Sequence, residues 1–289
     1  MTTKYGYTET CYLETNGIRL HYATVGDGPL MLFLHGFPEC WYSWRHQLVE
    51  FGKDYKAVAL DLRGYNESDK PKEKSAYVLP ELIKDVKGAI EALGYERCVL
   101  VGHDWGGAIA WTFAYEYPEM LERLIVLNLP HPAKFAQGLR SPQQLLRSWY
   151  IALFQLPILP ELLLKSNNYA AIRAAFENMA VDPETFSKTD LDMLVGAAKK
   201  PGALTSMLNY YRNIFQSGGV LNRAWGVLHV PTLMIWGEND TALGKALTYG
   251  TEEYVETFEI RYIPQCSHWV QQERPGLVNG YMWAFLNDE

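Results

Sequence analysis

The chain has 289 residues and a formal net charge of −7 at pH 7, from 26 basic and 33 acidic residues spread along its length. Because no basic run could neutralise phosphates, we expect neither a nucleic-acid partner nor an anionic membrane partner. The four cysteines lie far apart without C-x-x-C spacing, which argues against a disulfide framework or a zinc site.

Short apolar runs separated by helical patterns occupy the first half of the chain. Residues 18–25 alternate in polarity as an edge strand does. Continuous apolar runs, which predict strands buried on both faces, occur at residues 30–34, 57–60, 98–101 and 124–127. Helical periodicity separates them at residues 41–51, 79–93 and 107–117. This alternation predicts an α/β fold with a mostly parallel central sheet and helices on both faces.

The alternation of strands and helices stops after residue 127 and returns near residue 231. Between them the pattern is helical and is interrupted at prolines and glycines. Strand patterns at 233–236 and 258–263 and a helical pattern at 275–286 complete the chain. We therefore predict a core of residues 1–130 and 223–289 and an inserted all-helical cap of residues 131–222. Such a cap would cover the carboxyl ends of the strands, where α/β sheets bind ligands.

The hexapeptide GHDWGG, residues 102–107, stands between a predicted strand and a predicted helix. Gly102 and Gly106 flank Asp104 with the spacing of a nucleophile elbow, G-x-S-x-G, whose sharp turn exposes the central residue. Serine attack on saturated carbon would give an ether that water cannot reopen. A carboxylate gives an alkyl ester whose carbonyl belongs to the enzyme and can be hydrolysed. Asp104 thus indicates substitution at an sp3 carbon; the structural alternative is an aspartate that caps the following helix.

A base and an orienting acid should follow the nucleophile in the chain order of this kind of site. Among seven histidines, His268 alone follows the last predicted strand by a short loop, so we predict it as the base. The loop after the preceding strand offers Glu238 and Asp240, and Asp240 has the better reach. The acid could also follow the predicted strand at residues 124–127, but that position holds Asn128, whose neutral amide cannot balance the positive charge of an imidazolium.

The remaining groups needed are an oxyanion hole and donors for the leaving group. The peptide N–H groups of Phe37, in HGFPE, and Trp105 are placed to form the oxyanion hole. A halide leaves with N–H donors alone, whereas an opened epoxide needs acidic donors such as tyrosine. Tyr150 and Tyr211 fall on apolar helical stripes in the predicted cap, while Tyr210 turns about 100° away. Both stripes are also compatible with simple packing in the core. The first stripe consists of Leu146, Tyr150, Leu153 and Phe154, and the second of Leu204, Leu208, Tyr211 and Phe215.

Together these motifs resemble the epoxide hydrolases of the α/β-hydrolase superfamily, in particular the soluble plant enzymes and the animal type-3 and type-4 enzymes. The likeness follows the whole chain in order through HGFPE, DLRGY, GHDWGG, Y-x-x-x-F-Q-x-P at 150–157, N-Y-Y-R-N at 209–213, W-G-E-x-D and S-H-W. It implies the α/β-hydrolase fold and chemistry without metal or cofactor. It implies the roles argued above, and it adds Glu39 as a residue that holds the hydrolytic water. Ser267 stands where the family usually has glycine.

The resemblance implies that the substrates are a small apolar epoxide and water. A haloalkane or haloacid dehalogenase with the same Asp104 nucleophile is the first alternative, but HGFPE lacks the asparagine that often donates to halide. A ligand-binding relative without turnover is the second alternative. The start of the chain is polar and no apolar run approaches the ~20 residues of a membrane span. We therefore expect a cytoplasmic, soluble monomer or homodimer without a membrane partner.

Overall fold

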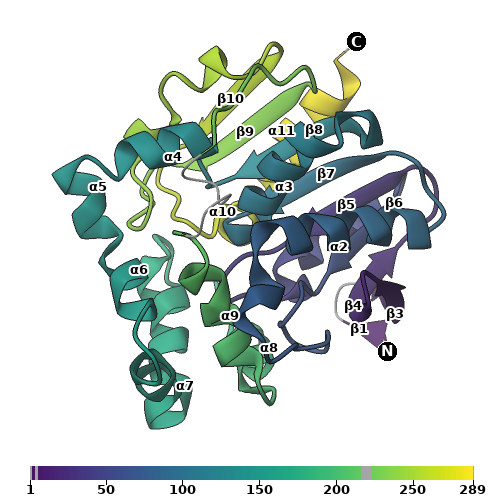
Figure 1. The fold of residues 1–289 in the computed structure, drawn as a ribbon. Helices are drawn as coiled ribbons and strands as arrows, with labels where there is room; N and C mark the ends of the chain where they lie inside the picture. Colours follow the sequence, from purple (N-terminus) through teal and green to yellow (C-terminus); the bar gives the residue numbers. More distant parts are fainter. Residues whose placement is uncertain (1, 4–5, 216–222, 289) are drawn as a thin grey trace.

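The computed structural model describes residues 2–3, 6–215 and 223–288, and its centre is an eight-stranded sheet (Figure 1). The order of the strands in the sheet is β10-β9-β8-β7-β5-β6-β4-β3. The strands from β10 to β6 are parallel, and β4 and β3 extend the sheet by antiparallel pairing. Their bounds are β3 Glu9–Thr15, β4 Ile18–Val25, β5 Leu30–Leu34, β6 Lys56–Leu60, β7 Cys98–His103, β8 Leu121–Leu127, β9 Thr232–Gly237 and β10 Phe258–Ile263. The short strands β1 (Thr2–Thr3) and β2 (Gly6–Tyr7) pair with each other.

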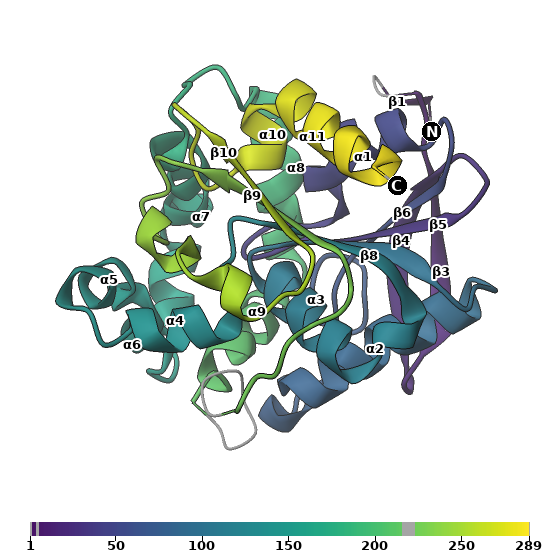
Figure 2. The same cartoon turned by 90° about the horizontal axis from the view of Figure 1, so that it is seen from above.

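Helices cover both faces of the sheet, as Figure 2 shows from above. Helices α2 (Leu79–Ala92) and α3 (Trp105–Glu116) lie on one face, and the other face carries α1 (Arg45–Phe51), α10 (Val270–Glu273) and α11 (Pro275–Asn287). Every strand and helix predicted for the core is present, which confirms the predicted fold class. Strand β3 was not predicted from the sequence, because only its last residues alternate between buried and exposed positions.

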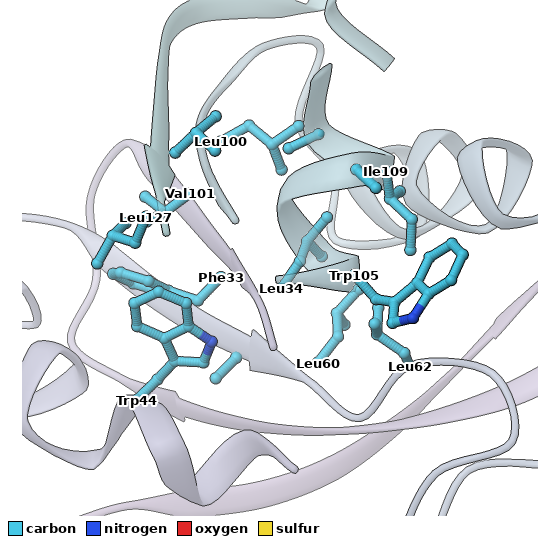
Figure 3. Close-up of a cluster of buried hydrophobic side chains, with 14 of the residues drawn as sticks. Phe33, Leu34, Trp44, Leu60, Leu62, Leu100, Val101, Trp105, Ile109 and Leu127 are labelled. Atoms are coloured by element: carbon cyan, nitrogen blue, oxygen red, sulfur yellow. The ribbon is translucent and has the colours of Figure 1, made fainter. Parts of the chain in front are cut away.

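The core is built on both faces of the central strands. Phe33 and Leu34 are consecutive residues of β5, so their side chains point to opposite faces. Phe33 packs against Trp44 with ring centroids 5.1 Å apart, while Leu34 lies on the side of Trp105 and Ile109 at the start of α3 (Figure 3). Burial of these large side chains packs the start of α3 against β5.

Six described helices fill the interval between β8 and β9 and gather on one side of the sheet (Figure 1). They are α4 Pro132–Gly138, α5 Pro142–Arg147, α6 Trp149–Phe154, α7 Leu159–Met179, α8 Lys188–Lys199 and α9 Ala203–Arg212. They occupy the interval predicted for the cap, whose predicted last residue, 222, lies outside the described residues. Hydrogen bonds tie this group to the core, including Tyr42 to Asp190 (2.9 Å) and Tyr210 to the Arg63 carbonyl (2.7 Å).

The two predicted apolar stripes are only partly right. The first stripe was expected on one helix, but the chain leaves helical geometry at Ser148, which separates α5 from α6. Leu146 therefore projects outward and is 76% exposed. On the second stripe, Phe215 lies beyond the end of α9 and is 56% exposed, whereas Leu204, Leu208 and Tyr211 are buried.

No helix among residues 2–3, 6–215 and 223–288 combines the length and apolarity needed to cross a membrane.

Candidate active site

The turn between β7 and α3 holds Asp104 in a rare backbone conformation. Its φ of 49° and ψ of −123° are unusual for a residue with a side chain. Such a sharp turn requires close backbone approaches, which the flanking glycines permit. A Cβ on Gly102 would lie 2.4 Å from the Gly106 oxygen, and one on Gly106 would lie 2.1 Å from the Leu34 oxygen. The two glycines of the elbow pattern are therefore required sterically, because a side chain at either position would clash with the backbone.

The loop after β5 brings a backbone donor against the Asp104 carboxylate. The Phe37 N–H donates a hydrogen bond of 2.8 Å to Asp104 Oδ1. Gly36 makes this approach possible, since a Cβ there would lie 2.3 Å from the Asp104 Cβ. Trp105 is the first residue of α3, so its peptide N–H has no acceptor within the helix. Both N–H groups predicted as the oxyanion hole thus belong to segments that meet at Asp104.

His268 lies between two carboxylates. Its Nδ1 is 2.6 Å from Asp240 Oδ2, and its Nε2 is 3.6 Å from Asp104 Oδ2. Asp240 follows β9 and is held in place by the N–H groups of Ala242 and Leu243, which donate to its Oδ1 at 2.8 and 2.9 Å. The structure therefore brings together the three side chains predicted as nucleophile, base and orienting acid.

The charges of this trio stabilise one another in a buried site. Burial lowers the pKa of His268, but the negative charges of Asp240 and Asp104 and the hydrogen bond to Asp240 outweigh it and raise that pKa well above its usual value. Burial raises the pKa of Asp104, but His268 offsets this and holds the pKa of the carboxyl below its usual value. The pKa of Asp240 is lowered in the same way. The two carboxylates therefore favour the protonated form of His268, and His268 favours their ionised form.

Asn128 has a part in the site that the sequence analysis missed. Its Nδ2 donates to Asp240 Oδ2 at 2.8 Å, and its Oδ1 accepts from the Gly237 N–H at 2.8 Å. The residue follows β8, which lies beside β9 in the sheet, so it reaches the loop that carries Asp240. Its place after an apolar run marks a strand end in the sequence, but an amide there was excluded as the orienting acid and given no other role. Asn128 fixes the direction in which Asp240 faces His268.

The cap places two tyrosines over Asp104. Tyr150 in α6 and Tyr211 in α9 face each other, with ring centroids 5.9 Å apart, and both contribute to the cavity that contains Asp104. Burial, together with the negative charge of Asp104, raises the pKa of each hydroxyl well above its usual value. Both groups therefore remain protonated and can donate hydrogen bonds. Tyr210 instead donates to the Arg63 carbonyl, so it turns away as its position on the helix predicts.

Glu39 lies behind the trio and bonds to His103. Its Oε2 accepts from the Gly36 N–H at 2.9 Å and lies 2.7 Å from His103 Nδ1. The other nitrogen of His103 is 2.8 Å from the His268 carbonyl oxygen. Oε1 of Glu39 accepts from the side chains of Gln271 and Gln272. Glu39 therefore supports the loop of His268 from within the core, and its contact with a hydrolytic water stays a prediction.

Two cavities of unequal size meet at Asp104, Tyr150 and Tyr211. We call them the small lobe, of about 50 Å³, and the large lobe, of about 590 Å³. The other walls of the small lobe are largely apolar and include Leu129, Pro132, Phe135, Ile151 and Ile214. The large lobe also reaches His268, and its apolar walls include Trp149, Leu153, Leu163, Ile172, Met179 and Trp269. The Asp104 carboxylate thus lies at the junction of two mostly apolar spaces.

Comparisons with known proteins agree with this architecture. Residues 29–275 match the model of the alpha/beta hydrolase fold family. Epoxide hydrolase 4 of Mus musculus is 44% identical, over 96% of this chain and 80% of the relative. Epoxide hydrolase 3 of Xenopus tropicalis is 45% identical, over 96% of this chain and 77% of the relative.

A solved structure gives the same result. The crystal structure of a Bacillus megaterium epoxide hydrolase in complex with an inhibitor superposes with a TM-score of 0.90. It is 40% identical, over 96% of this chain and all of the other. These matches confirm the resemblance that the motifs indicated. The chain therefore belongs to the epoxide hydrolases of the alpha/beta hydrolase fold family.

Proposed function

We propose that this protein hydrolyses an apolar epoxide to a vicinal diol through a covalent ester on Asp104. The observation that carries the proposal is the position of this carboxylate. It lies 3.6 Å from His268 Nε2, accepts a hydrogen bond from the Phe37 N–H, and shares its cavity with two protonated tyrosines. The names of the relatives support the same reaction.

In the first step Asp104 opens the ring. Its Oδ2 forms a bond to one epoxide carbon while the bond from that carbon to the ring oxygen breaks. Tyr150 and Tyr211 donate hydrogen bonds to this oxygen, and one of them supplies the proton that the alkoxide takes up. Oδ1 becomes the carbonyl oxygen of the ester and keeps its hydrogen bond to the Phe37 N–H.

In the second step water reopens the ester. His268 Nε2 takes a proton from a water molecule, whose oxygen attacks Cγ of Asp104. Negative charge then develops on Oδ1, where the N–H groups of Phe37 and Trp105 stabilise it. The bond from Cγ to the alkyl oxygen breaks, and the diol oxygen takes a proton from His268. The proton of the added hydroxyl, left on the Asp104 carboxyl, returns to the tyrosine that was ionised in the first step, so that both residues regain their starting states. Asp240, oriented by Asn128, stabilises the imidazolium throughout.

A substrate panel tests the reaction class. We expect diol formation from aryl and alkyl epoxides, measured by chromatography, and much slower release of halide from haloalkanes and fluoroacetate. The physical reason is that tyrosine hydroxyls match an alkoxide leaving group better than a halide. If haloalkanes or fluoroacetate released halide and none of the epoxides gave a diol, the protein would be a dehalogenase and the proposal would be wrong.

Oxygen labelling tests the ester. In a single turnover in ¹⁸O-water with excess protein, we expect the label in the Asp104 carboxylate and not in the diol, because water attacks Cγ. Mass spectrometry of the peptide that contains Asp104 and of the diol measures both products. Label that enters the diol directly would contradict the two-step route.

The pKa shifts predict that the two steps respond differently to acid. The lowered pKa of Asp104 keeps it ionised at mildly acidic pH, so ring opening continues there. Hydrolysis needs neutral His268. The ester removes the charge of Asp104, one of the two carboxylates that raise the pKa of His268 in the free protein, and leaves Asp240 as the other. We therefore expect the ester to accumulate as the pH falls from neutral, measured by intact mass after rapid quenching. Accumulation at alkaline pH instead would contradict the assignment of His268 as the base.

A further inference from the structure

Half of the exposed large apolar side chains of the described residues lie between residues 145 and 163. This interval runs from the end of α5 through α6 to the start of α7, and these helices project at one edge of the molecule (Figure 1 and Figure 2). We call residues 145–163 the apolar cap face. Large exposed apolar patches are rare on proteins that bind nothing there, so this face indicates an interaction surface. Its most exposed members, each with more than half of its surface in solvent, are Leu145, Leu146, Trp149, Ile158 and Leu162.

The start of α7 turns an apolar stripe to solvent. Leu159, Leu162 and Leu163 have the i, i+3, i+4 spacing that places side chains on one side of a helix. On a helix that packs against a core this side is buried, but here all three leucines are exposed. Glu161 faces the cap instead, where it pairs with Arg212 at 2.9 Å. The helix is therefore docked by its other side, and the leucine stripe has no partner within the described chain.

The apolar cap face surrounds the entrance to the large lobe. Leu146, Arg147, Trp149 and Leu163 belong to the face and also line that lobe. Leu146 and Trp149 are nevertheless 76% and 65% exposed, so the lobe opens to solvent at this face. Arg147 connects the face to the active site, because its Nη1 donates to the Asp240 carbonyl oxygen at 2.8 Å. A partner bound to the face would therefore lie at the entrance to the large lobe.

The charge around this face is opposite in sign to that of the whole protein. Residues 139–169 contain three basic residues, Arg140, Arg147 and Lys165, and one acidic residue, Glu161, which gives a net charge of +2 within a chain of net charge −7. The carboxylate of Glu161 is already paired inside the cap, whereas the side chains of Arg140 and Lys165 are exposed. An apolar surface edged by basic residues is typical of proteins that bind the surface of an anionic membrane.

We propose that the apolar cap face docks the protein on the surface of an anionic lipid bilayer. Its leucines and Trp149 enter the boundary between headgroups and acyl chains, while Arg140 and Lys165 contact the lipid phosphates. A second copy of this chain fits the face less well, because two facing copies would bring the same basic residues together. The net charge of the chain predicted no such partner, since a sum over the sequence does not show where charges gather in the fold.

Vesicle binding by the full chain tests the proposal. The probes are vesicles of phosphatidylcholine alone and of phosphatidylcholine with an equal amount of phosphatidylglycerol, and co-sedimentation gives the partition coefficient. We expect the wild type to bind the anionic vesicles and to bind them less as NaCl is raised, because salt screens the charges. Leu145→Gln combined with Leu162→Gln should lower this partition coefficient about tenfold, since two apolar side chains no longer enter the bilayer boundary.

A second pair of substitutions separates charge from apolar contact. Arg140→Gln combined with Lys165→Gln should lower the partition coefficient for anionic vesicles about tenfold and leave that for phosphatidylcholine unchanged. Val49→Gln combined with Leu277→Gln is the matched control, because it removes two exposed apolar side chains from α1 and α11, on one face of the sheet and outside the cap. The control should bind vesicles like the wild type. Unchanged thermal unfolding of each variant shows that the effects do not come from misfolding.

Three results would overturn the proposal. The first is a wild type that does not bind anionic vesicles. The second is binding that neither cap pair weakens, or that the control pair weakens equally, because the membrane contact would then lie elsewhere. The third is light scattering without vesicles that shows a dimer for the wild type and a monomer for Leu145→Gln combined with Leu162→Gln, because the face would then join two copies of the chain.

Discussion

Substitution of His268 by glutamine is expected to preserve ring opening and to stop ester hydrolysis, so that substrate remains attached to Asp104. Glutamine cannot take a proton from water, and a general base typically contributes about 10²–10⁴-fold to a rate. We expect turnover to fall by about the upper limit of that range. Intact mass and peptide mapping after incubation with an epoxide should show the substrate mass on the peptide that contains Asp104.

Two variants control this experiment. His229→Gln changes an exposed histidine, paired with Glu256 away from the trio, and should turn over like the wild type. Asp104→Asn combined with His268→Gln should form no adduct, because an amide is a poor nucleophile. An adduct on another residue, or none in His268→Gln despite confirmed substrate binding, would contradict the assignment of Asp104 as nucleophile.

Replacing both Tyr150 and Tyr211 by phenylalanine should reduce the rate of epoxide ring opening to a level that is hard to detect. Each hydroxyl is buried and protonated, and each should stabilise the developing alkoxide by about 1.5–3 kcal/mol. Loss of both should slow the formation of the Asp104 ester by about 10²–10⁴-fold. The single variants should lie between the double variant and the wild type. Rapid-quench measurement of the ester in a His268→Gln background isolates this step from hydrolysis.

Tyr210→Phe is the control for this pair. Tyr210 lies next to Tyr211 on α9 and is equally buried, but its hydroxyl donates to the Arg63 carbonyl. Its loss should lower the free energy of unfolding by about 1 kcal/mol and leave the rate of ring opening close to that of the wild type. Near-normal ring opening in the double variant would mean that other groups protonate the leaving oxygen. If Tyr210→Phe slowed ring opening as much as the double variant, the loss would come from altered packing of the cap on the core and not from the missing donors.

The core of the fold was predictable because its signals are local. Residues 98–101 are continuously apolar, and glycines follow them at positions that a tight turn needs, so strand, elbow and helix could be assigned without any distant contact. The break between α5 and α6 at Ser148 was not predictable, since periodicity continues through it and only the packing of the cap decides where the helix ends. The exposure of Leu146 follows from that break.

The sequence by itself determined the kinds of groups in the site and their order along the chain, because strand ends and loops are marked locally by apolar runs, glycines and prolines. Only the tertiary structure decided which of these groups meet. Asn128 reaches Asp240 because β8 lies beside β9, and Glu39 reaches the loop of His268 through His103. The way the cap docks on the sheet sets the lobes and brings Arg147 to the wall of one of them. Contacts of this kind join residues far apart in sequence, so their geometry depends on strand order and packing rather than on local pattern.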